Sequence, residues 1–501
     1  MKISHLPPLG ACRHHHGCCV AILLTLVFCL LTGSLSASER KPNFLFVYTD
    51  DQRWDAMSSV QREQGERGRF PWFQTPAMDR LAGEGVRFRH AFVTLSLCAP
   101  CRAVFLTGQY NHLNGIANNH THFPTNSVTY ASVLRSAGYT TGYFGKWHMD
   151  GQRGQRPGFD FSASFIGQGR YRDCPLEING ESHPTTGWVD DVTTDYALEF
   201  MKKNAKKPFA LAIGFKACHG PCDPPERAKD RFAGMEARAV PNLAIPAIYR
   251  TTNSAKASRL AEVAPGGKVK TNLQYFRCIS AADDNLDRLL KALDELGLRD
   301  DTVVVFCSDN GFYLGEHQLG DKRSCYDESL LIPMIVRYPR LFAKGKVLDQ
   351  MVLNIDIAPT FLDLAGLPVP ASMQGRSWVP LLTGKSSEWR QAFFCEYFRE
   401  QGYPNTPTIL GVRTDSAKLL KYPGHAEWTE LFDLKSDPYE LKNLVADPGH
   451  KRLLEQMLAE FDRQAKAVEF RVPPYADEMN PAGSEPDQPK TKKKGKRKAA
   501  E

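Results

Sequence analysis

The sequence predicts an α/β protein in which a large, mostly parallel sheet lies between layers of helices. One observation is a set of continuous apolar runs, which suit strands buried on both faces. Another is that helical stretches separate these runs, as in parallel sheets whose crossover connections are helices. The runs cover residues 43–48, 140–144, 209–215, 302–307 and 333–338, and the clearest helices are 127–137 and 272–296, each followed by a glycine.

The C-terminal part of the chain has a different pattern, which begins at about residue 391. Short strands are predicted at 393–398, 409–413 and 418–422, and a helix rich in charged residues follows at about 450–468. This order indicates a smaller C-terminal subdomain with an antiparallel sheet and a helix, ending near residue 474.

Polar residues follow four of the predicted parallel strands. In open α/β sheets, ligands bind beyond the carboxyl ends of the strands. A solvated loop would explain any one of these clusters, but not all four. They are Asp50-Asp51, Lys146-Trp147-His148, Lys216 to His219 and Ser308-Asp309-Asn310.

The first 37 residues have the pattern of a secretory signal peptide. Lys2 and Arg13 precede an apolar run at 18–31, and small residues follow at 33–37. The alternative is an uncleaved membrane anchor, although the run is short for a spanning helix. We therefore expect export to the periplasm or the extracellular space, with no stable membrane insertion after removal of the signal.

The positive charge of the chain lies at its two ends. Of the net charge of +7, residues 490–501 contribute +6 and residues 1–37 contribute +2, which leaves −1 for the residues between them. A body with this charge is not expected to bind nucleic acid. Residues 475–501 are predicted to form a disordered basic tail, for which polyanion binding is the less favoured interpretation.

Cysteine spacing indicates neither a zinc site nor a repeated disulfide framework. Four of the thirteen cysteines fall in the predicted signal, and the other nine have no regular spacing. Export allows disulfides, and Cys218 and Cys222 are close enough in sequence to be candidates.

The most informative segment runs from Cys98 through Pro100, Cys101 and Arg102 to Leu106-Thr107-Gly108. It resembles the signature of the type I sulfatases of the alkaline phosphatase superfamily, Cys-x-Pro-x-Arg followed by Leu-Thr-Gly. The resemblance implies an alkaline-phosphatase-like fold, and conversion of Cys98 to formylglycine by the formylglycine-generating enzyme. Cys101 departs from the family, which usually has Ser or Ala there. The competing interpretation of Cys98 is an ordinary buried cysteine.

The same resemblance implies a calcium site and a set of catalytic side chains. Hard oxygen donors suit Ca²⁺, cations suit a sulfate group, and imidazoles suit proton transfer near neutral pH. Hydrated formylglycine would attack sulfur with Asp309 nearby, His219 would protonate the leaving alcohol, and His148 would assist sulfate release. The implied calcium ligands are Asp50, Asp51, Cys98 as formylglycine, Asp309 and Asn310, and the implied catalytic residues are Cys98, Arg102, Lys146, His148, His219 and Lys322.

Four other histidines are not assigned to catalysis. His317 is predicted to be structural or to face the substrate, and His120, His122 and His183 are predicted to be loop histidines.

The resemblance extends over residues 41–474, as a sulfatase catalytic domain at 41–390 and a C-terminal subdomain at 391–474. Several segments resemble N-acetylglucosamine-6-sulfatases and related glycan sulfatases, so the implied substrate is a sulfated carbohydrate or another sulfate ester. Loops at 165–187 and 223–270 are expected to set specificity. One alternative is a phosphonate or phosphate ester hydrolase of the same superfamily. The other is a non-catalytic glycan-binding protein, if Cys98 stays unconverted.

Overall fold

The computed structural model describes residues 41–250, 262–386 and 388–473. The predicted signal peptide and basic tail lie outside the described residues. The described residues from Pro42 onward belong to one compact unit. Within the described ranges, no helix combines the length and the apolar character needed to cross a membrane.

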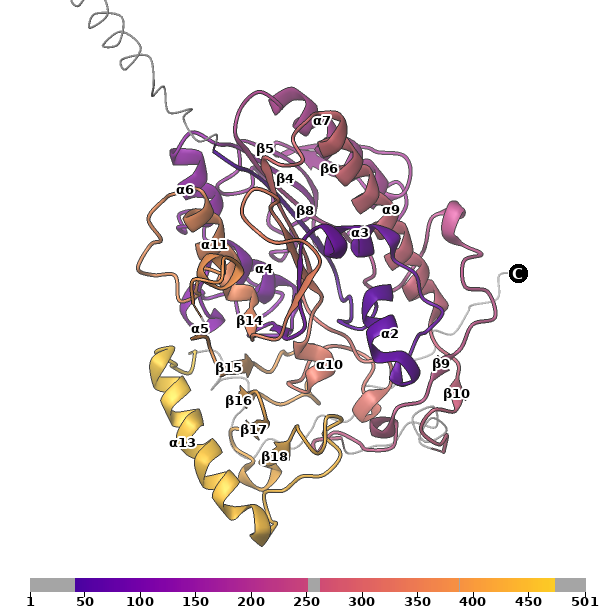
Figure 1. Ribbon diagram of the computed structural model, residues 1–501, viewed down its shortest axis with the longest axis vertical. Helices are drawn as coiled ribbons and strands as arrows, with labels where there is room; N and C mark the ends of the chain where they lie inside the picture. The colour runs from indigo at the N-terminus through magenta and orange to yellow at the C-terminus, as the bar shows by residue number, and fades with distance from the viewer. Residues whose placement is uncertain (1–40, 251–261, 387, 474–501) are drawn as a thin grey trace, which may run out of the picture. The chain divides into compact units, whose positions relative to one another are not determined.

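A ten-stranded sheet forms the centre of the molecule (Figure 1). Its five central strands, β11, β1, β8, β4 and β5, run parallel to one another. Four of them are the strands whose sequences end in polar clusters, so those clusters meet at one edge of the sheet. The full order is β13 (Lys346–Leu348), β2 (Val86–Phe88), β12 (Met334–Arg337), β11 (Thr302–Ser308), β1 (Asn43–Thr49), β8 (Phe209–Gly214), β4 (Thr140–Lys146), β5 (Phe161–Phe165), β6 (Leu176–Ile178) and β7 (Glu181–His183).

The strand predicted at 333–338 exists as β12, but it runs antiparallel to both β11 and β2. After β11 the chain stays at the carboxyl edge through the short helix α10 (Asp327–Leu330), instead of crossing back over the sheet. The next strand therefore starts at that edge and must run the other way. An apolar run reports burial on both faces and not strand direction, so treating this run like the parallel ones was wrong.

Helices cover both faces of the large sheet, because alternate side chains of its strands enter two separate cores. In β1, Phe44, Phe46 and Tyr48 belong to one core, whereas Leu45 and Val47 belong to the other. The first core includes α4 (Cys98–Thr107), α6 (Tyr130–Ser136) and α11 (Ile357–Leu364), and the second includes α3 (Pro76–Glu84), α7 (Val189–Asn204) and α9 (Leu273–Glu295).

The helices predicted at 127–137 and 272–296 correspond to α6 and α9. Helix α6 begins at Thr129, whose side chain accepts the Ser132 N–H in a capping box. Shorter elements complete the fold: α2 (Ser58–Gln64), α5 (Asn111–Asn114), α12 (Val379–Leu382), and the strand pairs β3 (Ala91–Phe92) with β14 (Val352–Leu353) and β9 (Ala237–Arg238) with β10 (Lys268–Val269).

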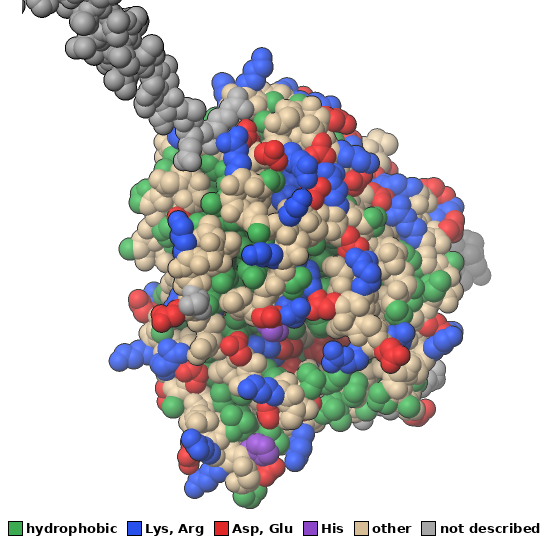
Figure 2. Space-filling model, viewed as in Figure 1, with side chains coloured by type: hydrophobic (Ala, Val, Ile, Leu, Met, Phe, Trp, Pro, Cys, Tyr) green, Lys and Arg blue, Asp and Glu red, His purple; other side chains and the backbone are tan. Residues whose placement is uncertain are grey.

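A second, antiparallel sheet follows in the C-terminal part, as predicted. It contains β15 (Ala392–Tyr397), β16 (Ile409–Thr414), β17 (Ala417–Lys421) and β18 (Glu430–Asp433). Helix α13 (Lys451–Ala467) packs on this sheet, with the ring of Phe461 5.4 Å from that of Phe394 (Figure 1). On the face drawn in Figure 2, acidic and basic side chains are interspersed, in keeping with the near-zero charge between the two chain ends.

A buried ion-pair cluster links the C-terminal sheet to helix α10. Lys418 on β17 is fully buried, and its Nζ lies 2.6 Å from Asp327 Oδ1 and 2.7 Å from Glu440 Oε1. Replacing Lys418 by alanine is expected to lower the free energy of unfolding by about 3 to 5 kcal/mol, because it leaves the buried Glu440 carboxylate without its ion-pair partner, whereas Asp327 keeps Arg413. Urea denaturation measures this change. The exposed Lys435→Ala variant is the control, and a loss for Lys418→Ala within about 1 kcal/mol, as for a surface pair, would contradict the prediction.

Candidate active site

The edge where the central strands end carries the predicted site residues. Asp50 and Asp51 follow β1, Asp309 and Asn310 follow β11, and Lys146 is the last residue of β4. Because β11, β1, β8 and β4 are neighbours in that order, residues far apart in sequence become adjacent.

Close approach of two strands helps to place Lys146. Gly145 has φ +81°, and a Cβ there would lie 2.1 Å from the Gly214 carbonyl oxygen on β8. Only glycine fits at such a contact. Lys146 is thereby fixed at the strand end, where its Nζ pairs with Asp50.

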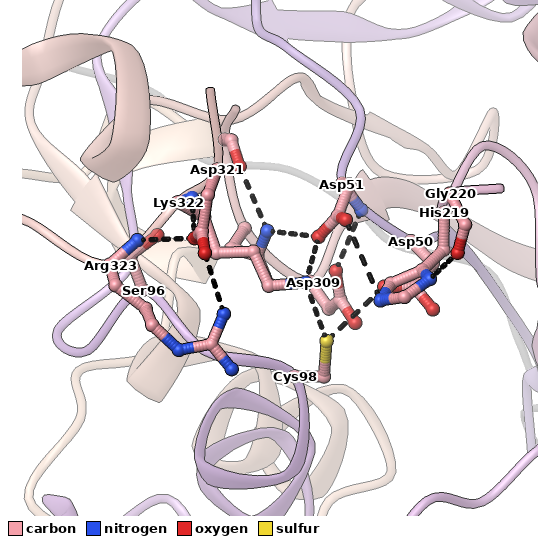
Figure 3. Close-up of polar contacts among 12 residues, drawn as sticks. Asp50, Asp51, Ser96, Cys98, His219, Gly220, Asp309, Asp321, Lys322 and Arg323 are labelled. Atoms are coloured by element: carbon pink, nitrogen blue, oxygen red, sulfur yellow. Dashed lines mark hydrogen bonds and ion pairs between the residues drawn. The ribbon is translucent and has the colours of Figure 1, made fainter. Parts of the chain in front are cut away.

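Cys98 lies at the start of α4, beneath this edge (Figure 3). It is fully buried, with Sγ 3.0 Å from Lys322 Nζ and 3.4 Å from Asp50 Oδ1. Burial and the nearby Asp50 raise the pKa of the Cys98 thiol to about 12. At neutral pH the unmodified side chain is therefore a protonated thiol, which is a poor nucleophile.

Three buried carboxylates beside Cys98 could hold a metal ion. Asp50, Asp51 and Asp309 each offer an oxygen, and these oxygens all lie within 4.8 Å of one another. The Asn310 side chain adds a buried Oδ1 that has no hydrogen-bond partner among the described residues. Burial and then Asp50 raise the pKa of Asp309 to about 7, which is the result expected for crowded carboxylates without a bound cation. An oxygen-rich, acidic donor set of this kind fits Ca²⁺.

Two lysines partner the carboxylates. Lys322 Nζ donates to Asp51 Oδ1 at 2.6 Å, and Lys146 pairs with Asp50. Although burial opposes it, Lys146 and other cations hold the pKa of Asp50 well below its usual range. Both lysines lie at the carboxylate cluster that also contains Cys98, where they could bind an anion.

Arg102 has a different environment from the two lysines. Its Nε and Nη2 donate to Asp309 Oδ2 at 3.0 and 2.8 Å, and its guanidinium lies over the Tyr48 ring. The residue is buried and also donates to the Lys146 carbonyl. In this structure Arg102 therefore orients Asp309 and the end of β4.

The two histidines predicted to transfer protons lie at the ends of β8 and β4. His219 Nδ1 contacts the Gly220 carbonyl at 2.7 Å, which leaves Nε2 facing Asp51 Oδ2 at 3.9 Å. Burial and the nearby Lys146 lower the pKa of His219 to about 4. His148 is buried with no partner for Nδ1 among the described residues, and burial together with Lys146 lowers its pKa well below the usual value.

The other histidines lie elsewhere or are enclosed. His120 and His122 are exposed, as predicted for loop residues, but His183 belongs to the short strand β7, so its assignment to a loop was wrong. His317 is buried and its ring stacks on Tyr326 at 3.9 Å, which favours the structural alternative.

The cysteines of the described ranges are all unbridged. The candidate pair Cys218 and Cys222 is not bonded, and Cys222 Sγ instead donates to the Cys218 carbonyl at 3.3 Å. Cys101 is buried on α4, and its Sγ accepts a hydrogen bond from Asn354 at 3.1 Å.

Two residues at this edge were not predicted. Asp190, in the first turn of α7, accepts the backbone N–H groups of Lys216 and Ala217 at 2.8 and 2.9 Å, so it fixes the segment leading to His219. Gln168, after β5, accepts from Lys146 Nζ at 2.6 Å. Asp190 carried no sequence signal, whereas Gln168 lies within the loop predicted to set specificity.

The fold and the site together are typical of hydrolases of the alkaline phosphatase superfamily. The sheet is mostly parallel, and its carboxyl edge carries buried carboxylates, lysines and a cysteine. The chain belongs to the sulfatase family, whose model matches residues 42–367, and it is accordingly an enzyme that hydrolyses sulfate esters. A second model, N-sulphoglucosamine sulphohydrolase, C-terminal, matches residues 315–467. The family and the fold implied by the Cys98 segment are thus confirmed.

Individual relatives are similar over most of their length. An N-acetylglucosamine-6-O-sulfatase of Bacteroides thetaiotaomicron is 31% identical, covering 85% of this chain and 87% of the relative. Human N-acetylglucosamine-6-sulfatase is 28% identical, with 87% of each chain covered. A solved structure of a protein in complex with its substrate, D-glucosamine-2-N,6-O-disulfate, has 28% identity and a TM-score of 0.76, covering 87% of this chain and 99% of that one.

Proposed function

We propose that this sulfatase removes a sulfate ester from a sulfated glycan, using a formylglycine made from Cys98 and a bound Ca²⁺ ion. The observation that carries the proposal is the position of Cys98. Its side chain lies buried between the Lys322 ammonium and the Asp50 carboxylate, inside the cluster suited to a metal.

The raised pKa of the Cys98 thiol supports the modification. A protonated, buried thiol would not attack sulfur at neutral pH. Formylglycine would supply a hydrated aldehyde with hydroxyl nucleophiles, and Ca²⁺ would polarise a sulfate oxygen and the attacking hydroxyl. Asp50, Asp51, Asp309 and Asn310 would hold the ion together with position 98.

The residues of the chain then have distinct tasks. Lys146 and Lys322 would stabilise the charge of the sulfate oxygens, and Arg102 keeps Asp309 oriented. His219 Nε2, the ring nitrogen that does not contact the Gly220 carbonyl, would protonate the leaving oxygen. Nearby cations contribute to the low pKa of His219, and the negative charge of a bound sulfate group would act in the opposite direction. His148 would assist release of sulfate.

The proposal that the substrate is a glycan rests on the substrates named for the relatives. Two of them are N-acetylglucosamine-6-sulfatases, and the solved structure holds a sulfated glucosamine. We also propose that residues 1–37 direct export, that the formylglycine-generating enzyme acts on Cys98 during maturation, and that residues 41–390 are the sulfatase catalytic domain and residues 391–474 its C-terminal subdomain.

A direct test compares two substrates. Protein made with the formylglycine-generating enzyme would be assayed with Ca²⁺ on N-acetylglucosamine-6-sulfate and on the matching 6-phosphate. The proposal expects a kcat/KM at least roughly 100-fold higher for the sulfate. Preference for the phosphate would favour the phosphate ester hydrolase alternative, and binding without turnover would favour the glycan-binding alternative.

His219→Ala is expected to lower kcat/KM most for substrates with poor leaving groups. Without a proton donor, kcat/KM for a sugar sulfate should fall by about 10²- to 10⁴-fold, but for 4-nitrophenyl sulfate, whose leaving group needs no proton, by less than about 10-fold. Steady-state kinetics on both substrates measures the difference. The exposed His183→Ala variant is the control, and equal losses on both substrates would contradict the assigned role.

A further inference from the structure

Gln168 lies where a fifth parallel strand reaches the site. It follows β5, which pairs in parallel with β4 so that Phe165 lies opposite Lys146. The loop after β5 therefore emerges at the same edge as Lys146, beside the carboxylate cluster. This loop is not among the four polar strand ends recognised in the sequence.

The side-chain amide of Gln168 has a defined orientation. Its Oε1 accepts a hydrogen bond from Lys146 Nζ at 2.6 Å. Because a lysine ammonium can only donate, the oxygen must face Lys146 and the NH₂ group must be the other arm of the amide. In the described part of the chain this Nε2 has no hydrogen-bond partner, and the residue is partly exposed.

The backbone around Gln168 is held by two side chains. Lys216, only 3% exposed, donates from Nζ to the Gln168 carbonyl at 2.8 Å. Tyr171, three residues further on, donates its hydroxyl to the His219 carbonyl at 2.9 Å. The loop is thus tied to the segment after β8, and the free N–H donors of Gln168 are positioned before a ligand binds.

We infer that Gln168 is a further substrate-contacting residue, whose Nε2 donates a hydrogen bond to a non-bridging oxygen of the bound sulfate group. This inference rests on the proposed function, because it places the sulfate beside Lys146. The Gln168 amide already contacts the Lys146 ammonium through Oε1. An anion paired with Lys146 would therefore lie next to Nε2 of the same amide. Gln168 would thereby add a donor without adding charge to a site that holds several cations.

Two substitutions separate substrate contact from a purely structural role. Gln168→Ala removes both arms of the amide, whereas Gln168→Glu keeps an acceptor for Lys146 but replaces the donor with a carboxylate oxygen. We expect kcat/KM for the sulfated sugar to fall by about 10- to 100-fold in Gln168→Ala, as for loss of a hydrogen bond to a charged group, and by at least as much in Gln168→Glu. Gln456→Glu, on the exposed side of α13, is the matched control.

A binding measurement separates this inference from the proposed function. The melting temperature of each full-length protein, with Ca²⁺ present, is recorded against increasing sodium sulfate, with sodium chloride at equal ionic strength as reference. The sulfate-specific rise should be present in the wild type and Gln456→Glu and lost in Gln168→Glu. It should appear even if no sulfate ester is turned over, in which case only the proposed function fails.

Three results would overturn the inference. In the first, kcat/KM of Gln168→Glu is within about twofold of the wild-type value while Gln168→Ala is impaired. The role of Gln168 would then be limited to accepting the hydrogen bond of Lys146. Another is near wild-type kinetics in both variants. The third is a sulfate-specific rise in melting temperature that is equal in Gln168→Glu and the wild type, or absent from both.

Discussion

Cys98→Ala should lower kcat for sulfate ester hydrolysis by roughly 10⁴-fold or more, because it removes the group proposed to become the nucleophile. Cys98 occupies a buried position between Lys322 and Asp50, within the proposed metal site. The alanine side chain is close in volume to that of cysteine, so the variant should keep the fold. Activity on a sulfated sugar, measured with circular dichroism as a check on folding, gives the result.

Cys101→Ala is a matched control, because it removes the other cysteine of the same helical turn. Its sulfur contacts Asn354, and its side chain belongs to the hydrophobic core on that face of the sheet. Activity close to the wild type is expected, since the family itself usually has Ser or Ala there. Retention of more than about a tenth of the activity in Cys98→Ala would rule out a nucleophile at position 98.

Removal of calcium is expected to lower kcat by about 10³-fold or more, since a metal ion of this kind supplies several kcal/mol of charge stabilisation. The structural reason is the cluster of Asp50, Asp51 and Asp309, whose offered oxygens all lie within 4.8 Å of one another and could hold the ion. Dialysis against EGTA followed by addition of Ca²⁺ tests this, and activity should return. The melting temperature should rise on Ca²⁺ addition as well, because the ion binds only the folded state.

The Asp51→Ala variant tests whether the effects of calcium depend on the cluster of Asp50, Asp51 and Asp309. The variant should lose both the calcium-dependent rise in melting temperature and the activity, while Asp349→Ala, an exposed carboxylate on the surface, should lose neither. Full activity after EGTA treatment, with no metal detected by elemental analysis, would contradict the assignment of a calcium site.

Much of the fold could be predicted because burial leaves a local signature. Continuous apolar runs identified four of the five central strands, all except β5, and the polar residues directly after them identified the edge where a site should form. The signature around Cys98 then linked that edge to one chemical class. These features depend on short stretches of sequence and on general rules of sheet topology.

Other features depend on contacts that no local pattern encodes. The antiparallel direction of β12 follows from the path of the chain through α10, and not from its apolar residues. Gln168 meets Lys146, and Asp190 fixes the segment before His219, only after separate strands have assembled. The structural place of His317 likewise follows from its stacking on Tyr326.

The most direct test of the account is the mass of the peptide that contains Cys98 and Arg102, from protein matured with the formylglycine-generating enzyme. Conversion of the thiol to an aldehyde lowers the mass by about 18 Da and supplies the nucleophile that the mechanism needs. We expect this shift in the active wild-type protein. A peptide with only unmodified cysteine, in protein that still hydrolyses sulfate esters, would contradict the central claim.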